Sequence, residues 1–326
     1  MVNGAPSSLL FGTTSYVLPA DLLPNVRLLA PYVDDIEMIL FEGEYSNLPS
    51  RRDIAELARL AEDGGCGFTV HLPLDVGIGE FDRSTRLRAQ DTCLRVIDLT
   101  ASLVPHAFVV HPELPLVFHP ALGEPPEPVG ELSADFMGRW HDALGGSFER
   151  FAAEAGPIPM AVENLQFPFG WLRPLLDDLD LGVTMDVGHL LLDGGTVEQH
   201  LTDFGDRLTV VHLHGIIDGC DHREISAFPP DELASLVEAI AGAPTRKPVV
   251  TGSPSTAGAS RSGGSDQVDD GRSVVVSLEV FGWEPTVPSL RTLAALLDGR
   301  REDAARFSEA ADAVLAALPE WLPIED

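Results

Sequence analysis

Residues 208–215 read LTVVHLHG, a short run of apolar and β-branched residues that ends in two histidines. Each run of this kind in the chain is nearly continuous in apolar residues rather than alternating, which is typical of strands in a parallel sheet covered on both faces. The other seven runs are LLFGTTSYV at 9–17, DIEMILFE at 35–42, GFTVHLP at 67–73, AFVVHPE at 107–113, IPMAVENL at 158–165, LGVTMDVGH at 181–189 and SVVVSLEVF at 273–281.

Amphipathic segments separate these runs and carry apolar residues at helical spacing. They span residues 51–63, 84–103, 133–155, 231–240 and 287–297. Alternating β and α units predict an α/β fold, a closed (β/α)8 TIM barrel in a single domain over residues 1–326. An open doubly wound sheet is the alternative, but no Gly-rich dinucleotide fingerprint follows any of the strands.

Two segments interrupt the pattern. Residues 248–272 are rich in Ser, Gly, Thr and Asp and poor in apolar residues, so they predict a low-complexity insertion that forms a flexible loop. Because this insertion precedes the eighth strand, it belongs to the N-terminal face of the barrel, away from the chemistry. The Pro-rich stretch 113–131 leaves the fourth strand on the opposite face, where it can cover a ligand.

The chain is strongly acidic, with 51 Asp and Glu against 21 Lys and Arg and a formal net charge of −30. Proteins bind nucleic-acid backbones mostly by neutralising phosphates with cations, so this charge argues against a nucleic-acid partner. No apolar run approaches the ~20 residues of a membrane span, and the N-terminus does not read as a signal peptide. Cys66, Cys93 and Cys220 form no paired framework. We expect a cytoplasmic protein without a membrane partner.

Six of the predicted strands end in His, Asp or Glu, the residue types that commonly bind metal ions. Such strand ends converge on the active site of a barrel, and imidazole with carboxylate suits Zn²⁺, Mn²⁺ or Fe²⁺. A single residue of this kind can be structural, and Asp186 can cap a helix, but six successive strands favour a metal centre, with Glu163 able to bridge two ions. The residues are His71, His111, Glu163, Asp186 with His189, His212 with His214, and Glu279.

In this order the residues resemble the xylose-isomerase-like TIM-barrel superfamily, most closely its endonuclease IV-like branch. The resemblance implies a phosphodiesterase site with two divalent transition-metal ions and a possible third. One ion would be held by His71, His111 and Glu163, a second by Glu163, Asp186, His212 and Glu279, and a third by His189 and His222.

The third site departs from the pattern of the resembled family, which has an Asp-x-His pair after the seventh strand. This chain reads Cys220-Asp221-His222 there. Either Asp221 is shifted by one position, or Cys220 replaces a carboxylate, or the third ion is missing. We expect His214 to support a metal ligand or to contact substrate.

The N-terminal third resembles a narrower group, the CbiR-like cobamide-remodelling phosphodiesterases, in residues 11–42, in EYSNLP at 44–49 and in TVHLPLD at 69–75. The resemblance implies that a corrinoid is the small-molecule partner. Hydrolysis of the nucleotide-loop phosphodiester of a cobamide would give cobinamide phosphate and the α-riboside. Metal-bound water would be the nucleophile, Glu163, Asp186 and Glu279 would be catalytic, and Tyr16, Asn25, Glu42 and Tyr45 would shape the substrate pocket.

Three other functions remain open. A sugar isomerase or epimerase of the same superfamily would use Glu163 and Glu279 to move protons at carbon beside a single metal ion, although one ion does not require so many histidines. An AP endonuclease must grip a DNA duplex, which the net charge opposes. A non-catalytic corrinoid binder or metal carrier predicts binding without turnover.

Overall fold

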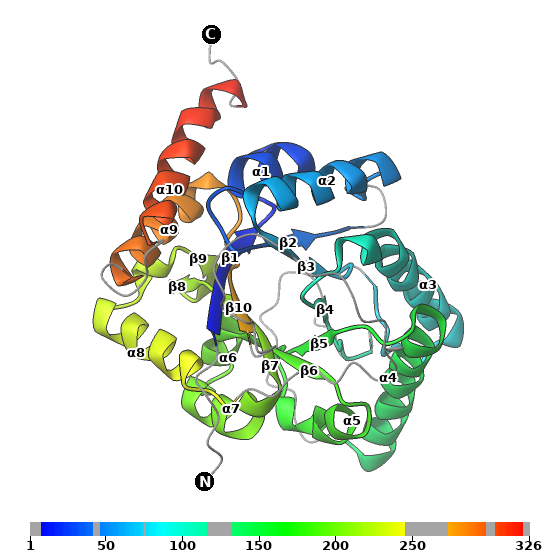
Figure 1. The fold of residues 1–326 in the computed structure, drawn as a ribbon. Helices are drawn as coiled ribbons and strands as arrows, with labels where there is room; N and C mark the ends of the chain where they lie inside the picture. The colour runs from blue at the N-terminus through cyan, green and yellow to red at the C-terminus, as the bar shows by residue number, and fades with distance from the viewer. Residues whose placement is uncertain are drawn as a thin grey trace, which may run out of the picture.

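Eight parallel strands close into a barrel at the centre of the molecule (Figure 1). The computed structural model describes residues 8–41, 46–74, 76–115, 132–244, 273–297 and 304–321. Around the barrel the order is β1-β2-β3-β4-β5-β6-β7-β10, and β10 closes against β1 with Val276 opposite Phe11. The predicted (β/α)8 fold class is therefore confirmed. The strands are β1 (Ser8–Thr14), β2 (Asp35–Ile39), β3 (Gly67–His71), β4 (Phe108–Val110), β5 (Met160–Glu163), β6 (Gly182–Asp186), β7 (Leu208–Leu213) and β10 (Ser273–Leu278).

Helices surround the barrel as an outer layer (Figure 1). Helix α2 begins at a capping box, in which Ser50 and Asp53 each accept a hydrogen bond from the other's backbone N–H. None of the described helices is long and apolar enough to cross a membrane. The helices are α1 (Leu22–Leu29), α2 (Arg51–Gly64), α3 (Arg83–Thr100), α4 (Ala134–Ala155), α5 (Arg173–Asp178), α6 (Val187–Leu192), α7 (Val197–Phe204), α8 (Pro230–Ala241), α9 (Trp283–Leu297) and α10 (Ala305–Ala317).

Side chains along each strand alternate between the helix layer and the barrel interior. In β2, Ile36 and Met38 belong to the large apolar core shared with the helices, whereas Glu37 contacts His212 across the interior. A separate small cluster of Ala107, Val109, Ala161 and Val210 fills part of the interior. In β4, β5 and β7 the residue two positions after a member of this cluster is His111, Glu163 or His212, so the ligand-type residues continue the interior face towards the C-terminal ends of the strands.

Some features of the fold were not predicted. Helix α10 packs on the barrel through Phe307, whose ring meets Phe11 edge-on at 6.2 Å, and Arg306 forms an ion pair of 2.6 Å with Asp34. A two-stranded hairpin, β8 (Gly215–Ile217) and β9 (Cys220–Arg223), follows β7. The predicted insertion at 248–272 and residues 116–131 of the Pro-rich stretch lie outside the described residues, so the flexible loop stays a prediction.

Candidate metal centre

Four side chains from four neighbouring strands meet at the C-terminal end of the barrel. Glu163 and Asp186 end β5 and β6, His212 lies in β7, and Glu279 follows β10 directly. One potential ligand atom from each lies within 4.8 Å of the others, and all four residues are buried. His212 Nδ1 is 3.0 Å from Glu279 Oε2, 3.5 Å from Glu163 Oε2 and 3.8 Å from Asp186 Oδ2. One imidazole and three carboxylates are a donor set that suits a divalent transition-metal ion. We call these four residues the tetrad.

Unsatisfied atoms in the tetrad show that a metal ion fits. His212 Nδ1 and Glu279 Oε2 are buried, and neither has a hydrogen-bond partner although they lie 3.0 Å apart. Polar atoms buried in this way destabilise a protein unless something compensates them. The other ring nitrogen, Nε2, lies 3.0 Å from Glu37 Oε1. When Nε2 donates to Glu37, Nδ1 presents a lone pair to the tetrad, which is the form of histidine that binds a metal.

The charge around His212 leads to the same conclusion. Burial opposes a charge on the ring, but the carboxylates of Glu279, Glu37 and Glu163 outweigh it and raise the pKa of His212 well above its usual value. For Asp186, burial opposes ionisation, yet the charge of His214 and the nearby rings of His212 and His214 hold its pKa far below the usual range. Asp186 is therefore ionised and needs positive charge nearby, either protons on the histidines or a cation.

A second group adjoins the tetrad through Glu163. His71 Nε2 and His111 Nε2 lie 3.2 and 3.1 Å from the same oxygen, Glu163 Oε2. Burial opposes the charge of His111, but Glu163 and Glu113 overcome it and raise the pKa of His111 to about 10. His71, His111 and Glu163 can together hold a metal ion. Because Glu163 belongs to both groups, its carboxylate can bridge two ions.

A third group depends on the hairpin. The β8–β9 turn contains Asp218 and Gly219, both with positive φ, as a tight hairpin turn requires. The hairpin brings Asp221 Oδ2 to 3.6 Å from His189 Nε2, and these two residues with His222 form a third set that can hold an ion. Cys220 is exposed and belongs to none of these groups. Of the alternatives that the sequence left open, the shifted Asp221 is the one that the geometry supports.

Backbone carbonyls orient three other histidines so that Nε2, and not Nδ1 as in His212, is available to a ligand. His71, His189 and His222 each place Nδ1 next to a carbonyl oxygen, to which it can donate. That contact leaves Nε2 as the nitrogen available to an ion or a carboxylate. The acceptors are the carbonyls of Leu72, Asn164 and Glu279, at 2.8, 3.3 and 3.1 Å.

Asp186 both caps a helix and belongs to the tetrad, so the two interpretations of this residue are compatible. Its Oδ1 accepts a hydrogen bond of 2.6 Å from the backbone N–H of His189 at the start of α6. His214 Nε2 lies 3.1 Å from both carboxylate oxygens. His214 Nδ1 accepts a hydrogen bond of 2.9 Å from the His222 backbone. His214 thus links the tetrad to the hairpin, and with His222 and Glu279 it forms a further set of potential metal ligands.

The predicted substrate-contacting residues divide into two kinds. Asn25 is completely buried, and its amide bonds only to the backbone of residues 17, 18, 20 and 21. The prediction that Asn25 contacts substrate is therefore wrong, because its polar atoms are used to fold this loop. Tyr16 is 37% exposed, and its ring lies edge-on to Phe41 and Phe281. Glu42 and Tyr45 lie outside the described residues.

An aromatic wall stands beside the third group of ligands. It consists of Tyr16, Phe41 and Phe281, whose neighbouring ring centroids lie 6.1 and 6.4 Å apart. Phe281 is 40% exposed and approaches the His222 ring to 5.0 Å. The wall offers an apolar surface to a ligand at the metal centre.

Sequence reasoning missed Glu37 and left Asp221 undecided. Glu37 lies in the middle of an apolar run, and the carboxylate chosen there was Glu42, at the end of the run. Alternation of side chains along β2 places Glu37 on the interior face. A charged residue there needs a partner, and this signal could have identified Glu37. For Asp221, the Asp-Gly pair at 218–219 was an available hairpin signal.

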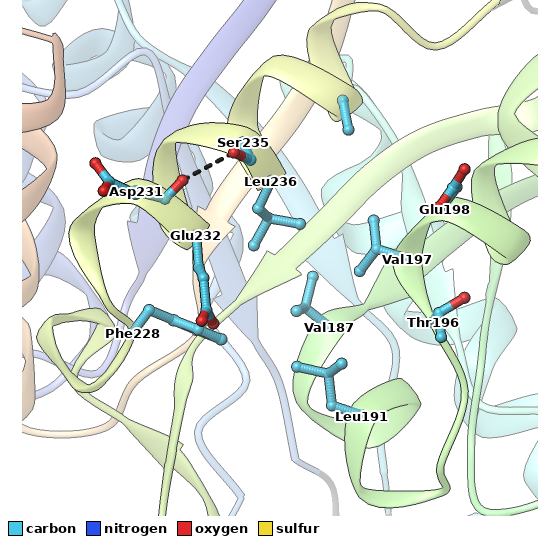
Figure 2. Close-up of a pocket in the computed structure, with 11 residues that line it drawn as sticks. Val187, Leu191, Thr196, Val197, Glu198, Phe228, Asp231, Glu232, Ser235 and Leu236 are labelled. Carbon is cyan, nitrogen blue, oxygen red and sulfur yellow. Dashed lines mark hydrogen bonds between the residues drawn. The ribbon is translucent and has the colours of Figure 1, made fainter.

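A separate cleft lies outside the barrel, between α6, α7 and α8 (Figure 2). Its volume is about 470 Å³, and apolar residues such as Val187, Leu191 and Leu236 line it beside Glu198 and Glu232. Val187 and Leu191 are four residues apart and share one face of α6, whereas His189 faces the metal centre. The cleft therefore lies on the side of α6 that faces away from the metal ligands, and it does not open onto them.

Comparison with known proteins agrees with this fold. The chain matches the sequence profile of the xylose isomerase-like TIM barrel family over residues 33–240, and it belongs to this family. No curated protein sequence matches the chain.

Several solved structures are similar to the chain throughout its length. A D-tagatose 3-epimerase-like protein has a TM-score of 0.57 and 18% identity, covering 96% of this chain and 99% of that one. The 3-keto-D-glucoside 4-epimerase YcjR from E. coli has a TM-score of 0.60 and 18% identity, covering 89% and 100%. An L-ribulose 3-epimerase has a TM-score of 0.54 and 15% identity, covering 96% and 95%.

These findings correct the functional expectation. The predicted phosphodiesterase acting on cobamides is contradicted, because several of the similar structures are sugar epimerases. The superfamily part of the resemblance is confirmed, whereas nothing supports the narrower likeness to CbiR-like proteins. The error has a physical source, since the same ring of His and carboxylate ligands at a barrel mouth can serve hydrolysis or proton transfer, and ligand order alone does not separate them.

Proposed function

We propose that this protein is a metal-dependent sugar isomerase or epimerase. The observation that carries the proposal is the tetrad, in which His212 Nδ1 and Glu279 Oε2 are buried, 3.0 Å apart and without hydrogen bonds. This arrangement suits a divalent ion with a carboxylate on either side. The similarity to epimerases of tagatose, ribulose and keto-glucoside supports a sugar as the substrate class.

Glu163 and Glu279 are the groups we assign to proton transfer. Burial opposes ionisation of Glu163, but His111 and His212 hold its pKa well below the usual value, so it is in the ionised form that a base requires. Glu279, at the end of the eighth barrel strand, can return a proton from its own side of the site. The bound ion would polarise the oxygen atoms of the sugar at the reacting carbons. Asp186 and His212 complete the ligand set and position the ion.

We assign further ions to the neighbouring groups. His71 and His111 with Glu163 would hold a second ion, and His189, Asp221 and His222 could hold a third. Mixed imidazole and carboxylate ligands favour Zn²⁺, Mn²⁺ or Fe²⁺ over Mg²⁺ or Ca²⁺. Metal analysis by plasma emission on protein loaded with each metal would count them, and one ion per chain would restrict binding to the tetrad.

The substrate we infer is small, polar and not a nucleic acid. The net charge of −30 repels a polyanion, whereas a neutral sugar needs no basic groove. The aromatic wall can cover the apolar face of a sugar ring, with Tyr16 as the residue we assign to substrate contact.

The experiment is a ketose panel incubated in D₂O with protein loaded with Mn²⁺, Zn²⁺ or Fe²⁺, followed by NMR. Proton transfer at carbon predicts an epimer or an aldose that carries deuterium at the reacting carbon. Conversion without deuterium would exclude a base that exchanges its proton with solvent. No conversion of any ketose by fully loaded protein would contradict the proposal.

A further inference from the structure

Five buried oxygen atoms inside the barrel have no hydrogen-bond partner among the described residues. Each belongs to a side chain that is at most 2% exposed. Native proteins pair nearly all such atoms with protein groups or with ordered water, and an unpaired buried oxygen is destabilising. The atoms are Asp35 Oδ1, Glu37 Oε2, Thr69 Oγ1, Thr184 Oγ1 and Ser277 Oγ.

Strand register places these oxygens in the interior beneath the tetrad. Gly12 of β1 is opposite both Asp35 of β2 and Ser277 of β10. Glu37 is opposite Thr69. Thr69, Thr184 and Ser277 precede His71, Asp186 and Glu279 by two residues, so they share the interior face with these ligands one layer lower.

Several of the surrounding interior side chains are small. TIM-barrel interiors are usually filled by bulky branched residues, but this one includes Gly12, Ala107 and Ala161 beside Val109 and Val210. A Cβ on Gly12 would lie only 2.3 Å from the carbonyl oxygen of Asp35, so no larger residue fits there without movement of the backbone. Large apolar side chains are therefore fewer in this layer than in a usual barrel interior.

The protonation of this layer favours water over a fixed partner. Burial raises the pKa of Asp35 to about 7, although Thr69 partly offsets the effect, so its carboxyl group is present both with and without a proton near neutrality. Water can donate to the ionised form and accept from the protonated form. Glu37 already has a direct contact from Oε1 to His212 Nε2 at 3.0 Å, so Oε2 is the oxygen left for water.

We propose that bound water occupies the barrel interior below the tetrad, where it bridges Asp35, Glu37, Thr69 and Ser277. Each water would have several oxygens within one layer as partners, as buried waters require. By bonding to Glu37 Oε2, this water fixes the carboxylate so that Oε1 accepts from His212 Nε2. Glu37 is thus a positioning residue for the tetrad. This second step rests on the proposed metal-dependent function, whereas the water itself does not.

Substitutions that remove one hydroxyl group test for bound water, because the sign of the change in Tm depends on whether the hydroxyl has a partner. If Thr69 and Ser277 were dry and unpaired, Thr69→Val and Ser277→Ala would remove an unsatisfied atom and raise the Tm of the metal-free protein. If the hydroxyls bind water, both substitutions lower it, which is the expected result. Direct contacts of Thr69 with Asp35 and of Ser277 with Glu37 would also lower it, so the relaxation measurement below separates the two causes. Thr286→Val is the matched control, because this buried hydroxyl donates directly to the Gly282 carbonyl at 2.7 Å. A rise in Tm for both interior variants, against a fall for the control, would overturn the proposal.

Magnetic relaxation dispersion of ²H and ¹⁷O counts long-lived internal water on wild-type protein and needs no variant. We expect such waters in the metal-free wild type, and fewer of them in the Thr69→Val/Ser277→Ala double variant. A wild type with none would refute the proposal. A wild-type Tm that rises when KCl or NaCl replaces choline chloride at equal ionic strength would show a cation in place of water.

The positioning step has its own readout. We expect the double variant to bind Zn²⁺ about tenfold more weakly in competition with a chromophoric chelator, as is common when the support of a ligand is lost. Unchanged Zn²⁺ affinity would contradict the positioning role of Glu37 towards His212, but it would not contradict the bound water. Because all these measurements are independent of turnover, a failure of the proposed epimerase activity would not change their outcome.

Discussion

The tetrad and the hairpin are two ways of holding ligands at the same barrel mouth. The tetrad residues stand in or directly after strands, and their side chains are at most 7% exposed. Asp221 and His222 stand on a short hairpin, their side chains are 31% and 27% exposed, and His222 has φ of 51°. Ligands on strands are held by the whole sheet, whereas ligands on a hairpin depend on one turn. From this comparison we expect an ion at the tetrad to be required for activity and the hairpin to adjust the site.

Glu163→Gln is expected to have the largest effect, because this residue connects the tetrad to the second group. The substitution keeps the shape and removes both the charge and the base. We expect turnover to fall by about 10²–10⁴-fold, the usual contribution of a general base, and metal content to fall with it. Far-UV circular dichroism should be unchanged, since polar strand ends in barrels serve the site more than the core. Normal turnover with full metal content would show that the tetrad is not the reaction centre.

The second largest expected effect is a difference in how the Tm of the metal-free and metal-loaded proteins depends on pH. The folded-state pKa values of His111 and His189 are raised to about 10 and 9, above the ordinary value of about 6.5. The stabilisation from their protons is complete below that ordinary value and is lost as pH rises through 9 to 10. Metal-free protein should therefore melt at progressively lower temperature between pH 7.5 and 10.

Metal-loaded protein should respond less over the same range, because the ion replaces those protons. Melts with and without chelator measure both states. A metal-free Tm that stays constant or rises with pH would contradict the assigned charges.

His222→Asn tests the hairpin with a smaller expected effect. Asn tolerates positive φ, so the backbone should keep its conformation while the imidazole is removed. We expect about tenfold lower turnover, the low end of what support around a metal site contributes, with the tetrad ion retained. Asp218→Asn is the matched control, since it also has positive φ in the same hairpin and belongs to none of the ligand groups. A loss of turnover as large as that of Glu163→Gln would mean that the hairpin ligands are as important for activity as the tetrad.

Cys220→Ser should have the smallest effect. The thiol is exposed and belongs to none of the ligand groups, whereas its neighbour Asp221 belongs to one. We expect unchanged metal content and Tm. A loss of one ion per chain would mean that the thiol, and not the Asp221 carboxylate, takes the third position in solution.

The sequence by itself determined the barrel and most of the ligand ring. Continuous apolar runs in regular alternation with helical segments allow few folds other than a covered parallel sheet. Each of His71, His111, Glu163, Asp186 and Glu279 ends such a run, and the C-terminal ends of parallel strands lie at one edge. These residues could therefore be placed together before any distance was known.

Only the tertiary structure decided which residues pair across the barrel. Glu37 and His212 are 175 residues apart in the chain, and β2 and β7 are not neighbours around the barrel, so the local pattern contains no sign of their contact. The choice of Asp221 over Cys220 depended on the register and turn of the hairpin, because a shift of one residue reverses which side chain faces the site. Asn25 looked like a pocket residue from its place in a loop, and only its five backbone hydrogen bonds show that it holds that loop together. A sequence specifies local periodicity directly, whereas closure of the barrel is what brings distant polar groups into contact.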